Sequence, residues 1–229
     1  MKKTSLIPTL LFAVSLPACL GGCGKAEPYR HDSFTFDTFV SFSIYETGDG
    51  ISAEEVCAGA VGMLNELDDT LSRTKADSEI SKINKNAGSG KVTVDTSTYN
   101  LLKSCTELSR LTDGAFDITL GDISDMWGFG KENPPMPDSD ELKKLAGKHS
   151  YRNIEFDDEN TSVRFTDGGF SLDLGAAAKG YAMDMLDSYL RKSGVTSAVV
   201  DFGGSILTIG KDNGNSRRIS ITADETNTL

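Results

Sequence analysis

The sequence predicts an α+β fold in which helices pack on a mostly antiparallel sheet. Segments with strand-like alternation and segments with helix-like spacing follow one another without the strict alternation of a parallel sheet. One pair of segments has the pattern of a β-hairpin, because Ile154 and Phe156 face Val163 and Phe165 across the turn "DDEN". With 229 residues, of which 38% are hydrophobic, the chain is long enough to bury a proper core.

The N-terminal segment has the features of a secretory signal. Lys2 and Lys3 precede an apolar run, residues 6–16, that is too short to cross a bilayer as a helix. The run is followed by "LGGC", which ends at Cys23 and resembles the lipobox of bacterial lipoproteins; "LPAC", which ends at Cys19, is a weaker second candidate. The alternative is an ordinary secretory signal in which the cysteines are incidental.

We therefore expect residues 1–22 to be a lipoprotein signal peptide, Cys23 to carry the lipid, and residues 23–33 to form a polar tether. Such lipidation adds several acyl chains, which suffices for stable anchoring. The expected location is a lipid anchor on the extracytoplasmic face of a bacterial membrane. The remaining residues, 34–229, contain no repeat and no clear domain boundary.

The first part of this domain predicts a strand and a helix. Residues from Phe34 to Ile44 alternate and predict one strand with every second side chain on one face. Ser52 and Glu55 form a capping box that opens a helix. The apolar stripe of this helix consists of Val56, Cys57, Ala60, Met63, Leu64, Leu67 and Leu71.

The middle of the chain is less regular. A loop at 72–84 and the short strand "GKVTVD" precede a second helix at 97–111, for which Gly114 is the stop signal. The segment from 114 to 140 has little periodicity and predicts a long irregular loop, followed by a short helix at 141–147. The side chains expected to point inward from the second helix are Leu101, Leu102, Cys105, Leu108 and Leu111.

The part that follows the hairpin predicts a strand, a helix and another strand. The stretch "SLDLGAAAKGYAMD", residues 171–184, begins with strand-like alternation and turns into a helix that runs to about Lys192, with Gly194 as its cap. The last segment, "SAVVDFGGSILTIG", predicts a strand broken by Gly203 and Gly204. A glycine pair inside a strand marks the close approach of another group.

Charge excludes one class of partner. The formal net charge is -11 and the pI is about 4.7, so the clustered Lys and Arg that nucleic-acid binding requires are missing and we expect no nucleic-acid partner. An acidic chain also repels an anionic substrate unless a cation intervenes. If the substrate is a phosphate, this composition favours a divalent metal.

Cysteine and histidine usage argues against two further kinds of site. Cys57 and Cys105 each lie on the apolar stripe of a predicted helix, so buried free thiols are favoured over a disulfide between them. The only histidines, His31 and His149, both lie in polar sequence surroundings. We therefore expect neither a Ser-His-Asp triad nor a histidine-based metal centre in this chain.

The stretch "DLGAAAKG" raises the question of a binding site. If a helix begins near Ala176, its free N–H groups form an anion pocket, and Gly175 keeps side-chain bulk away from it. Lys179 lies about one turn further along and can reach a phosphate, while Asp173 can accept a hydrogen bond from a sugar hydroxyl or a ring nitrogen. The alternative is a tight turn packed under a sheet, and the pattern alone does not decide between them.

Two other segments combine small residues with a carboxylate. Ala115, Phe116 and Asp117 follow the end of the second predicted helix, and "VDFGGSILTIG" adds a glycine pair next to Asp201. Three breaks of this kind, each beside a carboxylate, are difficult to explain by packing alone. They favour the close approach of a bulky anionic ligand.

Four motifs together resemble a known family. "LSRTKADSEISKIN", "GAFDIT…WGFG", "LDLGAAAKGYAMD" and "DFGGSILTIG" follow a lipoprotein signal in this order and span Leu71 to Gly210. They resemble the FAD:protein FMN transferase family, the ApbE family, and the strand "DTFVSFSIY" also fits. Four ordered motifs are far more specific than any one of them.

The resemblance implies a Mg2+-dependent transfer of the FMN moiety of FAD to a threonine hydroxyl on an acceptor subunit of a membrane redox complex. It also implies that the carbonyl of Ala176 binds the magnesium, and it leaves the catalytic base unknown. The residues that it places against FAD are Ala115, Phe116, Asp117, Asp173 and Lys179. Two alternatives stay open: hydrolysis of FAD to FMN and AMP, and a lipoprotein that binds FAD without turnover.

The sequence also departs from the family pattern. Phe36-Asp37-Thr38 stands where many members have Met-Gly-Thr, and Thr74 stands where a tyrosine is common. Members usually continue for roughly another hundred residues with an Asp-x-x-x-Thr magnesium motif, so we expect a C-terminally truncated or a divergent copy. Asp224 and Thr228 have the spacing of this motif but no apolar helix follows them, and we do not expect them to be ligands.

Overall fold

The structure is a computed structural model that describes residues 27–220 apart from 130, 135, 148 and 213. The predicted signal peptide, Cys23, Asp224 and Thr228 lie outside the described residues. Within the described part, none of the helices combines the length and apolar character needed to cross a bilayer.

The described elements follow one another without strict alternation, which confirms the predicted α+β class. They are β1 (Tyr29–Thr35), β2 (Thr38–Thr47), α1 (Ala53–Leu71), α2 (Glu79–Lys85), β3 (Val92–Thr93), α3 (Thr96–Leu111), α4 (Gly121–Trp127), α5 (Ser139–Ala146), a 3-10 turn η1 (Tyr151–Asn153), β4 (Ile154–Asp157), β5 (Ser162–Phe165), α6 (Ala178–Lys192), β6 (Val195–Phe202) and β7 (Ser205–Ile209).

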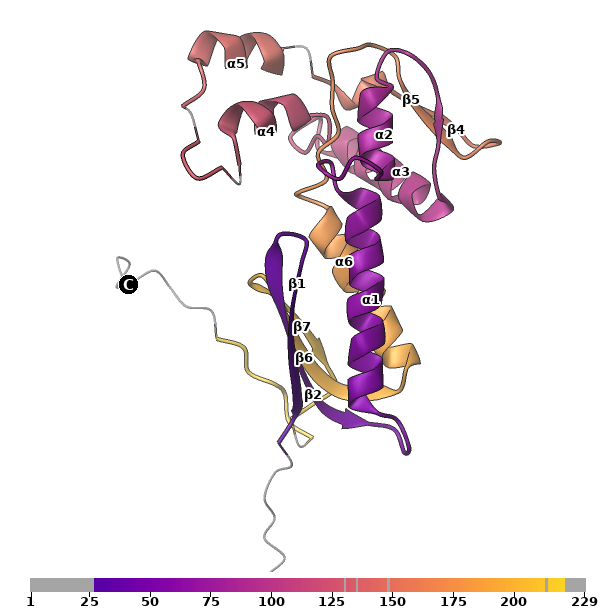
Figure 1. Ribbon diagram of the computed structural model, residues 1–229, viewed down its shortest axis with the longest axis vertical. Helices are drawn as coiled ribbons and strands as arrows, with labels where there is room; N and C mark the ends of the chain where they lie inside the picture. The colour runs from indigo at the N-terminus through magenta and orange to yellow at the C-terminus, as the bar shows by residue number, and fades with distance from the viewer. Residues whose placement is uncertain (1–26, 130, 135, 148, 213, 221–229) are drawn as a thin grey trace, which may run out of the picture.

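The molecule is elongated and has two parts, each with its own sheet and core (Figure 1). In the lower part of the view, a four-stranded sheet with the order β1-β2-β6-β7 packs against α1 and α6. In the upper part, a three-stranded sheet with the order β3-β5-β4 lies with α2 and α3, and α4 and α5 extend to one side. All strand pairs in both sheets are antiparallel.

The first predicted strand is in fact a hairpin, and part of the predicted tether belongs to it. β1 begins at Tyr29, and the chain turns back at Phe36 and Asp37, whose φ angles of 51° and 55° suit the tight turn of a two-residue hairpin. Reversal places Phe34 opposite Phe39 on the solvent side, so Phe34 is 59% exposed instead of sharing the buried face. Alternation alone does not reveal such a turn when no glycine or asparagine marks it.

The glycine pair near the end of the chain forms the turn between β6 and β7, as the break in the predicted strand indicated. Gly203 and Gly204 have φ angles of 60° and 89°. A Cβ atom on Gly203 would lie only 2.4 Å from the hydroxyl oxygen of Thr38, which confirms the predicted close approach. The approaching group is a side chain of the neighbouring hairpin.

The lower core confirms the capped helix. The Ser52 side chain accepts a hydrogen bond from the backbone N–H of Glu55 at 3.3 Å, and α1 then runs to Leu71 as predicted. Its buried stripe packs with α6 against the sheet. The fully buried side chains of this core include Phe42, Phe202, Leu64, Leu186, Leu190 and Ile209.

The upper core agrees with the predicted hairpin register but corrects one helix face. Ile154 pairs with Phe165, and Phe156 pairs with Val163, as predicted. Leu108 and Leu111 were expected inside, yet they are 44% and 67% exposed, because the buried face of α3 continues from Cys105 to Ser109 and leaves the two leucines to the side of it.

Two short helices lie in segments for which the sequence predicts only loops. α2 begins after Ser78, whose side chain accepts from the backbone N–H of Ser81 at 2.9 Å, and α4 occupies part of the segment expected to be irregular. Both helices have seven residues, which is too short for a 3.6-residue periodicity to become visible. The short helix predicted at 141–147 is present as α5.

The cysteines are buried and free, as expected. Cys57 and Cys105 form no disulfide, and burial raises the pKa of both thiols to about 11. The histidine surroundings differ from the expectation: the His149 ring packs edge-on at 5.3 Å from Phe170, so its environment is partly apolar.

Candidate functional site

The segments "GAFDITLG" and "SLDLG", far apart in sequence, run side by side. The backbone N–H of Asp173 donates to the carbonyl of Ile118 at 2.8 Å, and the N–H of Gly121 donates to the carbonyl of Ser171 at 2.9 Å. Leu120 and Ser171 form an isolated parallel bridge, so the strand predicted from residue 171 does not join either sheet. The structure thus brings two predicted ligand-binding motifs together.

Arg73 connects these two segments to the loop after α1. Its guanidinium donates to the carbonyl of Gly121 at 3.0 Å and lies 2.7 Å from the carboxylate of Asp125. Its Nε atom lies 3.9 Å from Asp173 and, among the described residues, has no hydrogen-bond partner although it is buried. The motif "LSRTKADSEISKIN" contains Arg73, but the sequence did not predict this role for it.

Asn84 holds the same region from the other side. Its side-chain amide donates to the carbonyl of Leu172 at 3.1 Å, and its side-chain carbonyl accepts from the backbone N–H of Leu172 at 2.7 Å. This pair of bonds fixes the extended segment that leads to Asp173. No local feature of "LSRTKADSEISKIN" distinguishes Asn84 from the other polar residues of this motif.

A close backbone approach explains the glycine in "LGD". A Cβ atom on Gly121 would lie 2.2 Å from the hydroxyl oxygen of Ser171. The Ser171 hydroxyl in turn donates to the carboxylate of Asp122 in the first turn of α4. These contacts attach the start of α4 to the segment that contains Asp173.

The three residues after α3 differ in what they can offer a ligand. Ala115 is exposed, and Phe116 is half-buried against the upper core. The Asp117 carboxylate accepts from the N–H and hydroxyl of Thr119 at 2.9 and 2.8 Å, and from the N–H of Tyr151 at 3.0 Å. Asp117 therefore orders the local backbone, whatever else it binds.

The start of α6 is unusual. The helix begins at Ala178, two residues later than the sequence suggested, because the carbonyl of Leu174 accepts the N–H groups of both Ala177 and Ala178, at 2.8 and 2.7 Å, and forms a separate turn. The N-cap Ala177 supplies no side-chain hydrogen bond, and the first turn contains no acidic residue. It contains Lys179 instead, which is half-buried.

This arrangement leaves polar groups available. In the part of the chain that the structure describes, the N–H groups of Lys179 and Gly180 and the carbonyl of Ala176 make no backbone hydrogen bond. Gly175 and Ala176 are exposed, and the Asp173 carboxylate accepts from the N–H of Gly175 at 2.8 Å. Free N–H groups, a cation and little side-chain bulk together suit a phosphate.

The fit of a divalent cation depends on the same turn. The described residues hold no group of three or more His, Cys, Asp or Glu side chains that could bind a metal. Magnesium is usually held by a few protein oxygens together with water and substrate phosphates. The exposed carbonyl of Ala176 fits the role of one such oxygen next to a bound phosphate.

Comparison with known proteins now assigns the chain. The model of the ApbE family matches residues 36–228. The chain belongs to the ApbE family. A FAD:protein FMN transferase of Treponema pallidum (strain Nichols) is 27% identical over 225 residues, which cover 95% of this chain and 62% of that protein. Another, from Klebsiella pneumoniae (strain 342), is 30% identical over 161 residues, which cover 70% of this chain and 51% of that protein.

Solved structures agree with this assignment. The crystal structure of the ApbE protein from Thermotoga maritima has a TM-score of 0.75 and 30% identity, and covers 82% of this chain and 61% of that chain. A variant of the flavin transferase ApbE from Vibrio cholerae has a TM-score of 0.77 and 27% identity, with 86% and 68% covered. The predicted fold and family resemblance are confirmed. The chain spans between about half and two thirds of the length of the curated relatives cited above.

Proposed function

We propose that this ApbE-family chain binds FAD with its pyrophosphate over the start of α6. The observation that carries the proposal is the composition of the first turn of α6. This turn has no side-chain cap and no acidic residue, and it contains Lys179, the opposite of what stabilises a helix start. A cation at a helix N-terminus destabilises the helix, and a bound anion would offset this cost. A binding role for Lys179 therefore explains its position. The names of the relatives cited above support FAD as the ligand.

Different residues of the chain bind different parts of FAD. Lys179 and the neighbouring N–H groups bind phosphate oxygens, while Asp173 accepts hydrogen bonds from the sugar or ring. Arg73 and the Gly175 N–H keep the Asp173 carboxylate in place. We assign Ala115 and Phe116 to the flavin nucleotide by their position in the family motif, on the segment that runs beside Asp173.

We also propose that the carbonyl of Ala176 is a ligand of Mg2+. When bound, the metal would neutralise pyrophosphate charge, which matters for a chain with a net charge of -11. The carbonyl is free of backbone hydrogen bonds among the described residues, so it needs no rearrangement to serve.

The proposed reaction is a phosphoryl transfer. The hydroxyl oxygen of an acceptor threonine forms a bond to the phosphorus of the FMN half, and the bond from that phosphorus to the bridging pyrophosphate oxygen breaks. AMP leaves with that oxygen, and the hydroxyl proton passes to a base or to solvent. Positioning and electrostatic stabilisation account for most of the catalysis of such displacements.

The test is incubation of the protein with FAD and Mg2+, with and without an acceptor protein that carries a reactive threonine. We expect equal amounts of AMP and acceptor-bound flavin, and neither product after chelation of the metal. AMP and free FMN without acceptor would instead indicate hydrolysis. Absence of AMP under every condition would leave an FAD-binding protein without turnover and would contradict the proposed transfer.

We further propose that Cys23 is lipidated and that the acceptor is a subunit of a membrane redox complex. The lipobox-like "LGGC" and the apolar run before it support this location. Replacement Cys23→Ser should move the protein from the membrane fraction to the soluble fraction. A protein that remains in the membrane fraction after this replacement would contradict lipidation at Cys23.

A further inference from the structure

A groove runs between α1, the start of α3 and α6. It consists of three hollows of about 510, 230 and 370 Å³, and neighbouring hollows share Thr70, Asp95, Ser97 and Tyr181. We call it the α1–α3 groove. Its middle hollow, of about 230 Å³, is lined by residues that include Met63, Glu66, Leu67, Asp95, Thr98 and Tyr181.

The groove lies on a different side of α6 from the proposed flavin site. Lys179 and Tyr181 are two residues apart, which separates their directions by roughly 160° around a helix. Tyr181, Asp184 and Met185 share one stripe of α6 and line the groove. The 370 Å³ hollow also reaches Ala177, the N-cap of α6, so the groove adjoins the proposed flavin site at this end only. The other two hollows are lined by neither Ala177 nor Lys179 and need their own explanation.

The middle hollow combines apolar walls with free negative charge. Met63, Leu67 and Met185 supply the apolar surface. Glu66 and Asp95 line the same hollow, and in the described part of the chain neither carboxylate forms a side-chain hydrogen bond or an ion pair. An apolar hollow with unneutralised carboxylates suits a ligand that has an alkyl stem and a cationic end.

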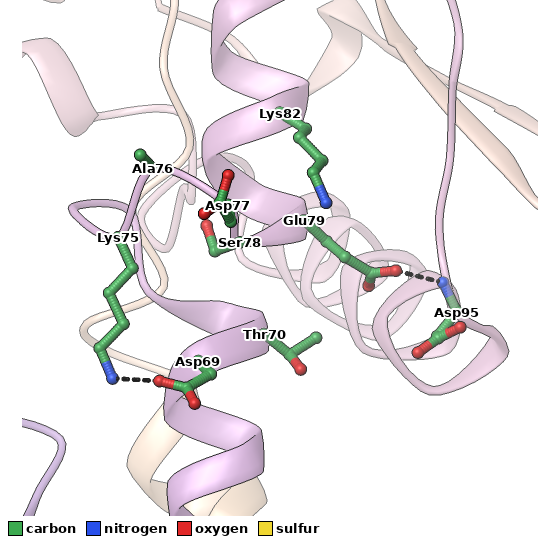
Figure 2. Close-up of a pocket in the computed structure, with 9 residues that line it drawn as sticks. All are labelled: Asp69, Thr70, Lys75, Ala76, Asp77, Ser78, Glu79, Lys82 and Asp95. Atoms are coloured by element: carbon green, nitrogen blue, oxygen red, sulfur yellow. Dashed lines mark hydrogen bonds and ion pairs between the residues drawn. The ribbon is translucent and has the colours of Figure 1, made fainter.

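The first hollow contains more carboxylates than cations: Asp69, Asp77, Glu79 and Asp95 line it together with Lys75 and Lys82 (Figure 2). Lys75 is already neutralised, because its ammonium lies 2.6 Å from Asp68 and 2.7 Å from Asp69. One oxygen of Glu79 accepts from the backbone N–H of Asp95 at 2.7 Å. Its other oxygen is buried and has no partner among the described residues.

A second polar group is buried without a partner in the middle hollow. Thr98 lines this hollow and is only 1% exposed, and its hydroxyl has no hydrogen-bond partner among the described residues. A buried hydroxyl without a partner is costly, and a ligand that hydrogen-bonds to it removes that cost. This observation is independent of the acidic side chains and points to an occupant of the groove.

We propose that the α1–α3 groove docks a segment of a partner polypeptide that presents an arginine or lysine between apolar residues. The stem of the basic side chain packs on Leu67, Met63 and Met185, and Tyr181 offers a ring face to the cation. The charged head binds Glu66 and Asp95, and a polar group of the segment reaches the Thr98 hydroxyl. The acidic lining commits the groove to a basic occupant.

The test measures binding of a labelled peptide, acetyl-Leu-Arg-Leu-Arg-Leu-amide, by fluorescence anisotropy at moderate salt. Its matched control carries citrulline in place of arginine, which keeps the shape and removes the charge. We expect the citrulline peptide to bind at least about tenfold more weakly. No saturable binding of the arginine peptide, or equal binding of both peptides, would overturn the proposal.

Variants separate the groove from the general attraction of a basic peptide to an acidic protein. The pair Glu66→Gln and Asp95→Asn should weaken binding of the arginine peptide about tenfold, since each exposed charge contributes a severalfold effect. The pair Glu46→Gln and Asp49→Asn removes two exposed carboxylates near the other end of α1 and should leave binding within about twofold. Equal losses in both pairs would contradict a specific site.

The Thr98 hydroxyl gives a second, uncharged readout. Thr98→Val should weaken binding about threefold, and Thr98→Ser should restore it, because one hydrogen bond is lost and regained. Unchanged binding in Thr98→Val would contradict the role of the hydroxyl. Competition by agmatine at the same concentration as the peptide would show that the site takes a small amine, which would overturn the polypeptide partner.

Discussion

The two long helices of the lower part begin in opposite ways, although they pack beside each other against the same sheet. α1 has the side-chain cap Ser52, with Glu54 and Glu55 in its first turn. α6 has Ala177 at the same position and Lys179 where α1 has Glu54. α1 therefore has a side-chain cap and an acidic first turn, both of which stabilise a helix start, and α6 has neither.

The difference teaches where to look for function. Both helices bury a regular apolar stripe, so they resemble each other in how they pack. The difference lies in their first turns. A helix start that is poor for stability is retained where something else uses its free N–H groups. We therefore interpret the start of α1 as purely structural and the start of α6 as a binding site.

The largest expected effect comes from giving α6 the charge of α1. Lys179→Glu should weaken FAD binding about a hundredfold, because a charged contact to phosphate is lost and a repulsion is added. The same change should raise the free energy of unfolding by about 1 kcal/mol, since an acidic residue suits the helix start. Isothermal titration and urea unfolding measure the two quantities on the same samples.

Loss of affinity together with loss of stability in this variant would contradict the interpretation, because it would mean that Lys179 holds the fold together. Lys179→Arg is the matched control and should keep most of the affinity.

The next largest effect concerns the residue that connects the site. Arg73→Ala should lower the free energy of unfolding by about 2 kcal/mol, since it removes charged contacts to Gly121 and Asp125. FAD affinity should fall about tenfold, because Asp173 loses its neighbour. Arg73→Lys should lie between the wild type and the alanine variant in both measurements.

The mirror-image change at α1 should affect stability alone. Ser52→Ala removes the cap at Glu55 and should cost about 1 kcal/mol in the free energy of unfolding, measured by urea titration. FAD affinity should remain within experimental error of the wild type. A change in FAD affinity here would break the distinction between the two helix starts.

The smallest effect calibrates these charge changes at a site remote from both helix starts. Asp157 has its pKa lowered to about 2, first by the hydrogen bond from Lys91 and then by Asn160. A lowered folded-state pKa stabilises the protein above the ordinary value of 3.8, and this contribution is lost as the pH falls toward 2. Lys91→Ala should therefore destabilise the protein at pH 7 more than at pH 3, and an equal effect at both pH values would contradict this contact.

Periodicity predicted the long elements and the hairpin register, and it failed where local geometry decided the outcome. The alternation from Phe34 to Ile44 was correct as strand, but the turn at Phe36 and Asp37 contains no glycine, and Asp37 is its only residue with a preference for positive φ. This weak signal did not interrupt the alternation. Leu108 and Leu111 fit an apolar stripe on α3, yet the buried face in the last turn passes through the polar Ser109 instead.

The candidate site was predictable in its motifs and not in its connections. The small residues and Lys179 of "DLGAAAKG" suggested an anion site as one of two interpretations, beside a tight packed turn, and the other motifs favoured it. Arg73 and Asn84 were not identified, because their partners lie about fifty and ninety residues away in the chain, and such contacts leave no local pattern.

The most direct test of the central claim is thermal unfolding with and without saturating FAD and Mg2+ for the wild type, Ser52→Ala and Lys179→Ala. A ligand that binds only the folded state raises the melting temperature. We predict that FAD raises it equally in the wild type and in Ser52→Ala, and far less in Lys179→Ala. An equal rise in all three proteins would contradict the assignment of the α6 start as the FAD site.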